Sequence, residues 1–228
     1  MIAGNWKMNN TSEQALRLTQ DLVTQCATSK DVDVVICPPF TSLEKVHDLI
    51  KNTAIKLGAQ NTNKHEAGAY TGEISSAMIK SVGCRYVIIG HSERRHIYHE
   101  NNSLINQKLQ SVMTHDLIPI LCIGETLDEQ ENNLTLNVIQ SQLAEGLRDI
   151  AFNADNMIIA YEPVWAIGTG KVATPEQAQD VHAFIRNYLN QKDHEIKLTV
   201  SSYQKDTPIL IGHGKDDDVV PVEASKLA

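Results

Sequence analysis

Short apolar runs alternate with helical patterns through most of this 228-residue sequence, and this alternation limits the possible folds more than any other feature. Nearly all-apolar strands separated by helices are typical of a parallel sheet whose faces are covered by helices. The sequence therefore predicts an α/β fold, either a (β/α)8 barrel or an open doubly wound sheet. The expected strands are Ile2–Lys7, Val32–Cys37, Ile55–Gln60, Tyr86–Gly90, Leu117–Gly124, Ile158–Ala160 and Ile196–Val200.

Several of the intervening helices carry a start signal, in which a Thr and an acidic or amide residue three positions later can satisfy the free amides of the first turn. These pairs are Thr11 with Gln14, Thr41 with Glu44, Thr126 with Glu129, and Thr174 with Gln177. The third pair is expected to open one long helix through Leu147.

The alternation breaks after Val200. Only six residues separate it from the next strand-like run, Thr207–Ile211, whereas a crossover with its helix takes about 10–12 residues or more. The sequence thus contains no ordinary eighth βα unit. The run around Leu210 is a candidate for an antiparallel or irregular eighth strand.

Composition excludes several classes of protein. A net charge of −8 argues against a nucleic-acid partner or an anionic membrane surface. The N-terminus has no signal-peptide pattern, and no run approaches the roughly 20 apolar residues that span a bilayer. The four scattered cysteines form no CxxC pair, which favours reduced thiols and a cytoplasmic location.

Polar residues gather where the expected strands end. The first strand ends in Asn5 and Lys7, the fourth in His91 and Ser92, and the sixth delivers Glu162. The carboxyl ends of parallel barrel strands meet on one face, where catalytic residues lie. A carboxylate, an imidazole and a cation together suit proton abstraction beside a carbonyl group.

Two short patterns resemble motifs of other enzymes and fail at one position each. Gly90–Arg94 resembles a GxSxG nucleophile elbow, but Arg94 stands where the last glycine belongs. The pair Gly170-Lys171 matches the end of the phosphate-binding P-loop motif GxxxxGK, but Trp165 stands where that motif begins with glycine.

Six motifs in order resemble the triosephosphate isomerase family over residues 2 to about 200. They are GNWKMN at 4–9, GAQN at 58–61, GAYTGEIS at 68–75, IIGHSERR at 88–95, CIGE at 122–125, and AYEPVWAIGTG at 160–170 with TPEQAQ following at 174–179. The resemblance implies a (β/α)8 barrel, here irregular or incomplete at the last strand and helices. Residues 1–200 would form this barrel, and residues 201–228 would be an atypical tail rather than a second domain.

The resemblance also implies a reaction, the interconversion of dihydroxyacetone phosphate and glyceraldehyde 3-phosphate without metal or organic cofactor. Glu162 would be the base, His91 the neutral imidazole that polarises the carbonyl, Lys7 the cation beside the enediolate, and Asn5 a polar partner in the same pocket. Glu93 would be a buried supporting carboxylate, with Ser92 and Cys122 in supporting positions.

Further residues follow from the same resemblance. The stretch from Trp165 through Gly168, Thr169 and Lys171 would be a lid that closes on the substrate phosphate, and Ser201 or Ser202 could contribute to that phosphate site. The loop containing Thr71, Gly72 and Glu73 would insert into a second subunit, which predicts a homodimer.

The tail departs from the family. Residues 200–203 replace the family's Tyr-Gly-Gly-Ser turn, and no Gly-Gly pair occurs anywhere to bind phosphate. Residues 204–228 instead resemble the end of carboxylesterase-type α/β-hydrolases, in which Asp217 would match the catalytic-triad aspartate. Reduced isomerase activity, a barrel without activity, and a serine hydrolase are the resulting alternatives; the broken elbow disfavours the last.

Overall fold

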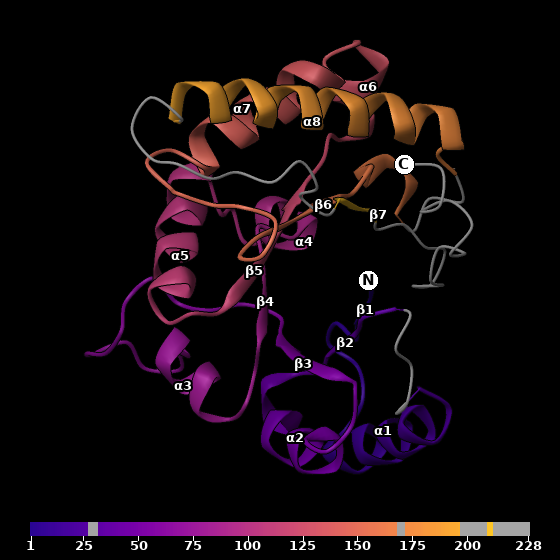
Figure 1. Cartoon of the computed structure of the whole chain (residues 1–228), viewed down its shortest axis with the longest axis vertical. Coiled ribbons are helices and arrows are strands. Elements are labelled where there is room, and N and C mark those ends of the chain that lie inside the picture. The colour runs from indigo at the N-terminus through magenta and orange to yellow at the C-terminus, as the bar shows by residue number, and fades with distance from the viewer. Residues whose placement is uncertain (27–31, 168–171, 197–208, 212–228) are drawn as a thin grey trace. The chain divides into compact units, whose positions relative to one another are not determined.

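The computed structural model describes residues 1–26, 32–167, 172–196 and 209–211, and its contacts divide the chain into two compact units. The first unit comprises residues 1–89 and 107–120, and the second comprises 90–106 and 121–228. Helices and strands alternate along the chain as expected (Figure 1). The sequence motifs at 201–208 and Asp217 lie outside the described residues.

The first unit is built on parallel strands that neighbour one another in sequence order. These are β1 (Ile2–Asn5), β2 (Val34–Cys37), β3 (Lys56–Ala59), β4 (Tyr86–Ile89) and the first half of β5 (Ile118–Ile123). Asn5 pairs with Cys37 in register, which places the end of β1 beside the end of β2. The helices of this unit are α1 (Ser12–Cys26), α2 (Leu43–Ile50), α3 (Ser76–Ser81) and most of α5 (Asn102–Thr114).

The second unit contains the other half of β5, then β6 (Ile158–Tyr161) and β7 (Ile209–Ile211). Its helices are α4 (Ser92–His96), α6 (Leu127–Glu131), α7 (Thr135–Gly146) and α8 (Pro175–Ile196). Strand β6 is buried at every position, and α7 packs against α8. Buried Ile139, Leu143, Ile185 and Leu189 come from these two helices.

The apolar runs predicted the first six strands to within two residues at each end. A strand that is apolar at every position loses water contact on both faces, and this burial dominates the folding free energy. Three capping pairs are also confirmed. Thr11 and Gln14, Thr126 and Glu129, and Thr174 and Gln177 exchange side-chain and backbone hydrogen bonds.

Two helix predictions were wrong. Thr41 lies inside a 3₁₀ turn, η1 (Phe40–Ser42), and α2 begins after it without a side-chain cap. The predicted helix from Thr126 to Leu147 is divided into α6 and α7, because Asn133 adopts a left-handed conformation with φ of 57°. Asn tolerates this conformation better than most residues, so it ends the helix without a glycine.

The order of the last strands also differs from the prediction. Ile196 is the last residue of α8, and residues 197–200 lie outside the described residues. The strand beside β6 is β7, which pairs Ile209 with Ile159 and Leu210 with Ala160 in parallel. The run around Leu210 thus occupies the place next to β6, rather than an antiparallel or irregular eighth position.

Within the described part of the chain, no helix combines the length and the hydrophobicity needed to cross a bilayer.

Candidate active site

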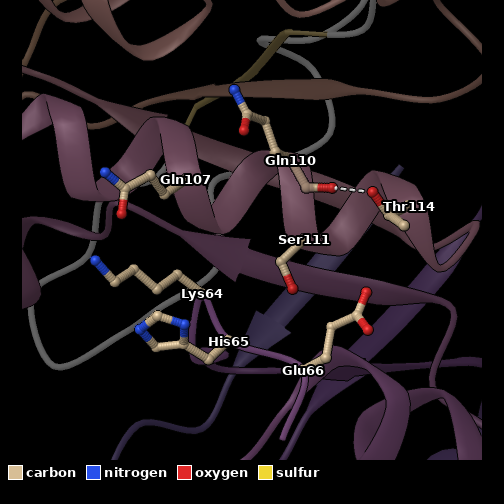
Figure 2. Close-up of a pocket in the computed structure, with 7 residues that line it drawn as sticks. All are labelled: Lys64, His65, Glu66, Gln107, Gln110, Ser111 and Thr114. Atoms are coloured by element: carbon tan, nitrogen blue, oxygen red, sulfur yellow. Dashed lines mark hydrogen bonds between the residues drawn. The ribbon is translucent and has the colours of Figure 1, made fainter.

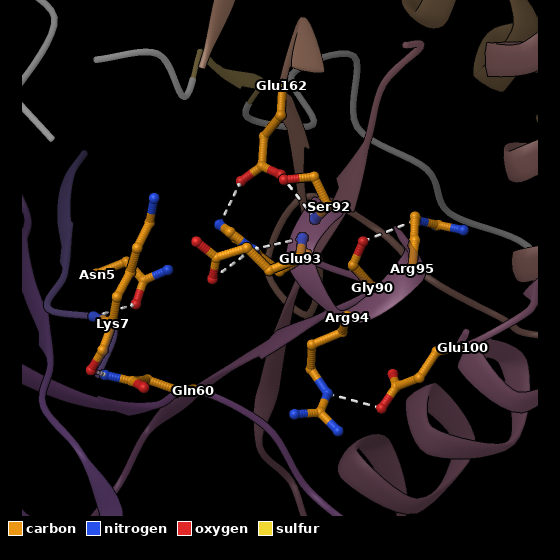
Figure 3. A network of polar contacts seen from close by, with 11 residues as sticks. Asn5, Lys7, Gln60, Gly90, Ser92, Glu93, Arg94, Arg95, Glu100 and Glu162 are labelled. Atoms are coloured by element: carbon orange, nitrogen blue, oxygen red, sulfur yellow. Dashed lines mark hydrogen bonds and ion pairs between the residues drawn. The ribbon is translucent and has the colours of Figure 1, made fainter. Parts of the chain in front are cut away.

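Glu162 follows directly after β6, at the carboxyl end of that strand. Its amide donates to the carbonyl of Ile123, at the end of β5, over 2.7 Å. The side chain is 10% exposed, so its carboxylate lies in a mostly water-excluded position. A buried carboxylate needs a hydrogen-bond donor to hold it. The Ser92 amide supplies one, at 3.2 Å from Glu162 Oε2 (Figure 3).

His91 lies between β4 and α4 and is also buried, at 6% exposure. Its Nδ1 accepts a hydrogen bond from the Glu93 amide at 3.2 Å, so Nδ1 carries no proton and the ring is neutral with its proton on Nε2. Nε2 lies 3.4 Å from Glu162 Oε1. The structure therefore brings the predicted base and the predicted imidazole together.

Glu93 is placed differently from the prediction. Its side chain is 42% exposed, and its carboxylate Oε2 lies 3.5 Å from His91 Nδ1. The expectation of a buried carboxylate was wrong, because the side chain of Glu93 is partly exposed, and it is the backbone amide of Glu93 that donates a hydrogen bond to the His91 ring. Cys122 is buried, and its carbonyl accepts a hydrogen bond from the side chain of Arg95 at 3.1 Å.

A second buried carboxylate, Glu125, lies beneath the hinge of the expected lid. It accepts hydrogen bonds from the Tyr161 hydroxyl at 3.0 Å and from Trp165 Nε1 at 2.7 Å. Burial raises the pKa of Glu125, and the hydrogen bonds from Trp165 and Tyr161 oppose that shift. Burial beside this carboxylate raises the pKa of Tyr161 as well. Trp165, in the 3₁₀ turn η2 (Val164–Ala166), is thereby fixed to the end of β5.

Asn5 and Lys7 belong to the first unit. The Lys7 amide donates to Asn5 Oδ1 at 3.0 Å, and Lys7 has a left-handed backbone with φ of 50°. Gln60 Nε2 donates to the carbonyls of Lys7 at 2.9 Å and of Cys37 at 2.8 Å. The amide of Gln60 therefore holds the strained turn at the end of β1.

Other predicted site residues are either exposed or beyond the described ranges. Thr71, Gly72 and Glu73 are exposed, and Gly72 has φ of 91°. Gly168, Thr169, Lys171, Ser201 and Ser202 lie outside the described residues. Among the residues that the structure does describe, no cluster of His, Cys, Asp or Glu could hold a metal ion.

Sequence reasoning missed three side chains that support Glu162 and His91. Gln142 on α7 bonds both the amide and the carbonyl of Gly124, each at 2.9 Å. Arg95 on α4 binds the carbonyls of Gly90 and Cys122. Glu125, the third, holds Trp165. Only Glu125 had a signal in the sequence, because it follows a strand as Glu162 does.

A separate pocket of about 350 Å³ lies in the first unit, between the segment 64–66 and α5 (Figure 2). Most of its lining side chains are exposed, and the Ser111 hydroxyl at its wall already pairs with that of Ser76 at 2.9 Å. It contains none of the predicted catalytic residues. The lining residues are Lys64, His65, Glu66, Gln107, Gln110, Ser111 and Thr114.

A parallel βα chain that holds a buried carboxylate against a neutral imidazole at its strand ends belongs with the barrel enzymes that move protons beside carbonyl groups. The sequence profile of the family described as triosephosphate isomerase matches residues 1–212. The chain belongs to the triosephosphate isomerase family.

Curated relatives and a solved structure agree with this assignment. The triosephosphate isomerase of Endomicrobium trichonymphae is 48% identical over 86% of this chain and 78% of its own length. That of Chlamydia muridarum is 46% identical over 92% of this chain and 76% of its own. The crystal structure of triosephosphate isomerase from Bartonella henselae is 37% identical, with a TM-score of 0.78 over 93% of this chain and 82% of that one. The chain thus has the barrel fold of this family.

Proposed function

We propose that this chain interconverts dihydroxyacetone phosphate and glyceraldehyde 3-phosphate, a step of glycolysis and gluconeogenesis. The observation that carries the proposal is the contact between Glu162 and His91 at the ends of β6 and β4, in a chain of this family. The reaction needs only a base and a proton donor, and it requires no metal or organic cofactor.

Glu162 is the proposed base. Its carboxylate takes the proton from the carbon next to the carbonyl group, and it returns a proton to the neighbouring carbon. Because Oε1 lies 3.4 Å from His91 Nε2, no substrate atom fits between them, so substrate must displace Glu162 from its bond to the Ser92 amide. That bond is a neutral amide donor to a carboxylate, which a moving side chain can exchange for a contact with substrate.

His91 is the proposed electrophile. The Glu93 amide occupies Nδ1 and leaves Nε2–H as the donor toward a substrate oxygen. A neutral imidazole can donate a hydrogen bond from Nε2–H to the enediolate oxygen, and it does not need to be a charged imidazolium to do so. Lys7, with Asn5 beside its amide, is the proposed cation that stabilises the negative charge of the enediolate.

The substrate phosphate is assigned to the segment after Trp165, with Gly168, Thr169 and Lys171, and to Ser201 or Ser202. The hydrogen bond from Trp165 to Glu125 supports this assignment, because it gives a lid a fixed anchor at one end.

The loop with Thr71, Gly72 and Glu73 is exposed, and we assign it to a homodimer interface in a cytoplasmic enzyme. Sedimentation equilibrium at micromolar concentration should give twice the chain mass, and a monomer would exclude the dimer.

The reaction is tested by a coupled assay from glyceraldehyde 3-phosphate, with Glu162→Asp as the diagnostic variant. Asp keeps the charge but withdraws the carboxylate by about one methylene, and a displacement of about 1 Å can cost on the order of 10²-fold in rate. We expect kcat to fall by at least that factor while KM changes little. A folded wild-type chain without turnover would contradict the proposal and leave an inactive barrel.

A further inference from the structure

Arg95 is a cation near the site to which the proposed reaction gives no role. Its guanidinium makes three hydrogen bonds within the second unit, of which Figure 3 shows the one to the Gly90 carbonyl. Nε donates to the Gly90 carbonyl at 2.7 Å, Nη2 to the Cys122 carbonyl at 3.1 Å, and Nη1 to Asn102 Oδ1 at 2.7 Å. The planar guanidinium thus joins the end of β4 to the end of β5.

Each of these carbonyls is one step away from a proposed catalytic residue. The Gly90 carbonyl belongs to the peptide group that connects Gly90 to His91, so a rotation of that peptide turns the imidazole. Cys122 precedes Ile123, whose carbonyl accepts the Glu162 amide at 2.7 Å. Arg95 therefore connects the backbone that carries the imidazole to the strand that supports the carboxylate.

The turn at Gly90 fits around this guanidinium. Gly90 has φ of 72°, a left-handed conformation that favours glycine. A Cβ at this position would lie 3.0 Å from Arg95 Nη2 and 3.2 Å from the Cys122 carbonyl. The backbone is thus pressed against the guanidinium, which leaves the Gly90–His91 peptide little freedom to rotate.

Only an arginine can make this set of contacts. A guanidinium offers donors in a rigid plane, whereas a lysine ammonium is a point donor that cannot span two carbonyls and an amide in the same way. Burial lowers the pKa of Arg95 to about 10, and the nearby carboxylates of Glu162 and Glu100 oppose that shift, so the side chain stays charged at neutral pH.

We propose that Arg95 is a positioning residue that sets the distance and angle between the His91 imidazole and the Glu162 carboxylate. It acts through the Gly90 and Cys122 carbonyls and does not touch the substrate. The kinetic part of this inference rests on the proposed isomerase reaction, whereas the geometric part concerns only the His91 ring.

The test compares Arg95→Lys and Arg95→Gln with the wild-type chain. We expect kcat to fall on the order of 10²-fold with KM within about threefold, because misplacement by about 1 Å affects the chemical step more than substrate binding. The Nε2–H signal of His91, assigned in ¹⁵N NMR spectra by its absence in His91→Gln, should shift or broaden. In Arg95→Ala, added guanidinium ion should restore part of kcat, because it can occupy the vacated site.

Two further variants separate positioning from stability. Asn102→Ala removes the Nη1 contact and, besides it, an exposed 3.4 Å hydrogen bond from Asn102 Nδ2 to Glu145, so it should fold and shift the His91 signal in the same direction by a smaller amount. Asn106→Ala is the matched control, since Asn106 also donates to two backbone carbonyls, those of Gly146 and Arg148, at 2.9 and 2.8 Å. It should lower the melting temperature and leave kcat and the His91 signal unchanged.

The outcomes distinguish this inference from the proposed function. Arg95 variants that lose stability as Asn106→Ala does, with an unchanged His91 signal, would overturn the positioning role. If the wild-type chain has no isomerase activity, the proposed function fails, and the His91 signal in the Arg95 and Asn102 variants still decides the inference.

Discussion

At the scale of single residues, Gly124 sets how closely the end of β5 approaches Glu162. A Cβ at Gly124 would lie only 1.7 Å from the Glu162 carbonyl oxygen, and backbone cannot yield as a flexible side chain can. Gln142 holds both polar groups of Gly124, which prevents the peptide from moving aside. Gly124→Ala should therefore displace Glu162 and cost about 1–3 kcal/mol of stability through overpacking.

The measurements are urea unfolding and kcat, which should fall at least tenfold in Gly124→Ala. Gly146→Ala, in the last turn of α7, is the matched control, because a Cβ there meets no atom within 4 Å. It should be neutral or stabilise the protein by about 0.5–1 kcal/mol, since alanine favours a helix over glycine. Equal behaviour of the two variants would show that the close approach at Gly124 is not required.

Some residues of the candidate site could be predicted from the sequence, and others could not. Glu162 and His91 could be predicted because each follows an apolar strand, and the ends of parallel strands carry the chemistry of such folds. Arg95 and Gln142 could not. Their partners are backbone carbonyls and amides on other elements, and no sequence pattern records which carbonyl a side chain reaches in the folded chain.

At the scale of elements, burial of His182 makes α8 sensitive to acid. His182 is 4% exposed, its Nε2 has no hydrogen-bond partner among the described residues, and its ring packs edge-on against Tyr161. Burial, reinforced by the Arg186 cation, lowers the pKa of His182 to about 4. The His pKa in the unfolded chain is about 6.5. Between about pH 4 and 6.5, the unfolded chain therefore binds a proton at His182 and the folded chain does not.

The stability contributed by neutral His182 is fully present above about pH 6.5 and is lost as the pH falls toward about 4. One proton limits the slope to about 1.4 kcal/mol per pH unit. His182→Phe should give a flatter dependence of unfolding free energy on pH between 7 and 5, measured in urea. Replacement of the exposed His96 by Gln should leave the slope as in wild type; an equally steep slope in His182→Phe would refute the assignment to His182.

Strands and helix starts could be predicted where a local sequence signal determines them. Apolar runs located the first six strands, and capping pairs located three helix starts, because both signals are local. The division between α6 and α7 arises from the backbone of a single asparagine, Asn133, in an otherwise helical pattern. The position of Ile209–Ile211 beside β6 depends on pairing between segments that lie far apart in the sequence, and no local signal records that pairing.

At the scale of the whole molecule, the chain combines the proposed catalytic pair, Glu162 and His91, with a C-terminal sequence that contains no Gly-Gly pair. In this reaction, binding of the phosphate contributes to stabilising the transition state, so a weak phosphate site lowers kcat/KM rather than abolishing the chemistry. We expect kcat/KM for glyceraldehyde 3-phosphate to lie orders of magnitude below that of the Endomicrobium relative.

The comparison that tests this expectation uses glyceraldehyde, which has no phosphate, as a second substrate. Both enzymes should process glyceraldehyde at similar low rates, because Glu162 and His91 are in contact in this chain. The difference between the two enzymes should therefore appear only with the phosphorylated substrate. Replacing residues 201–228 by the C-terminal segment of the relative should restore most of the lost kcat/KM. If this chain discriminates between the two substrates as strongly as the relative does, residues 201–228 themselves bind the phosphate, and Ser201 and Ser202 become the first positions to substitute.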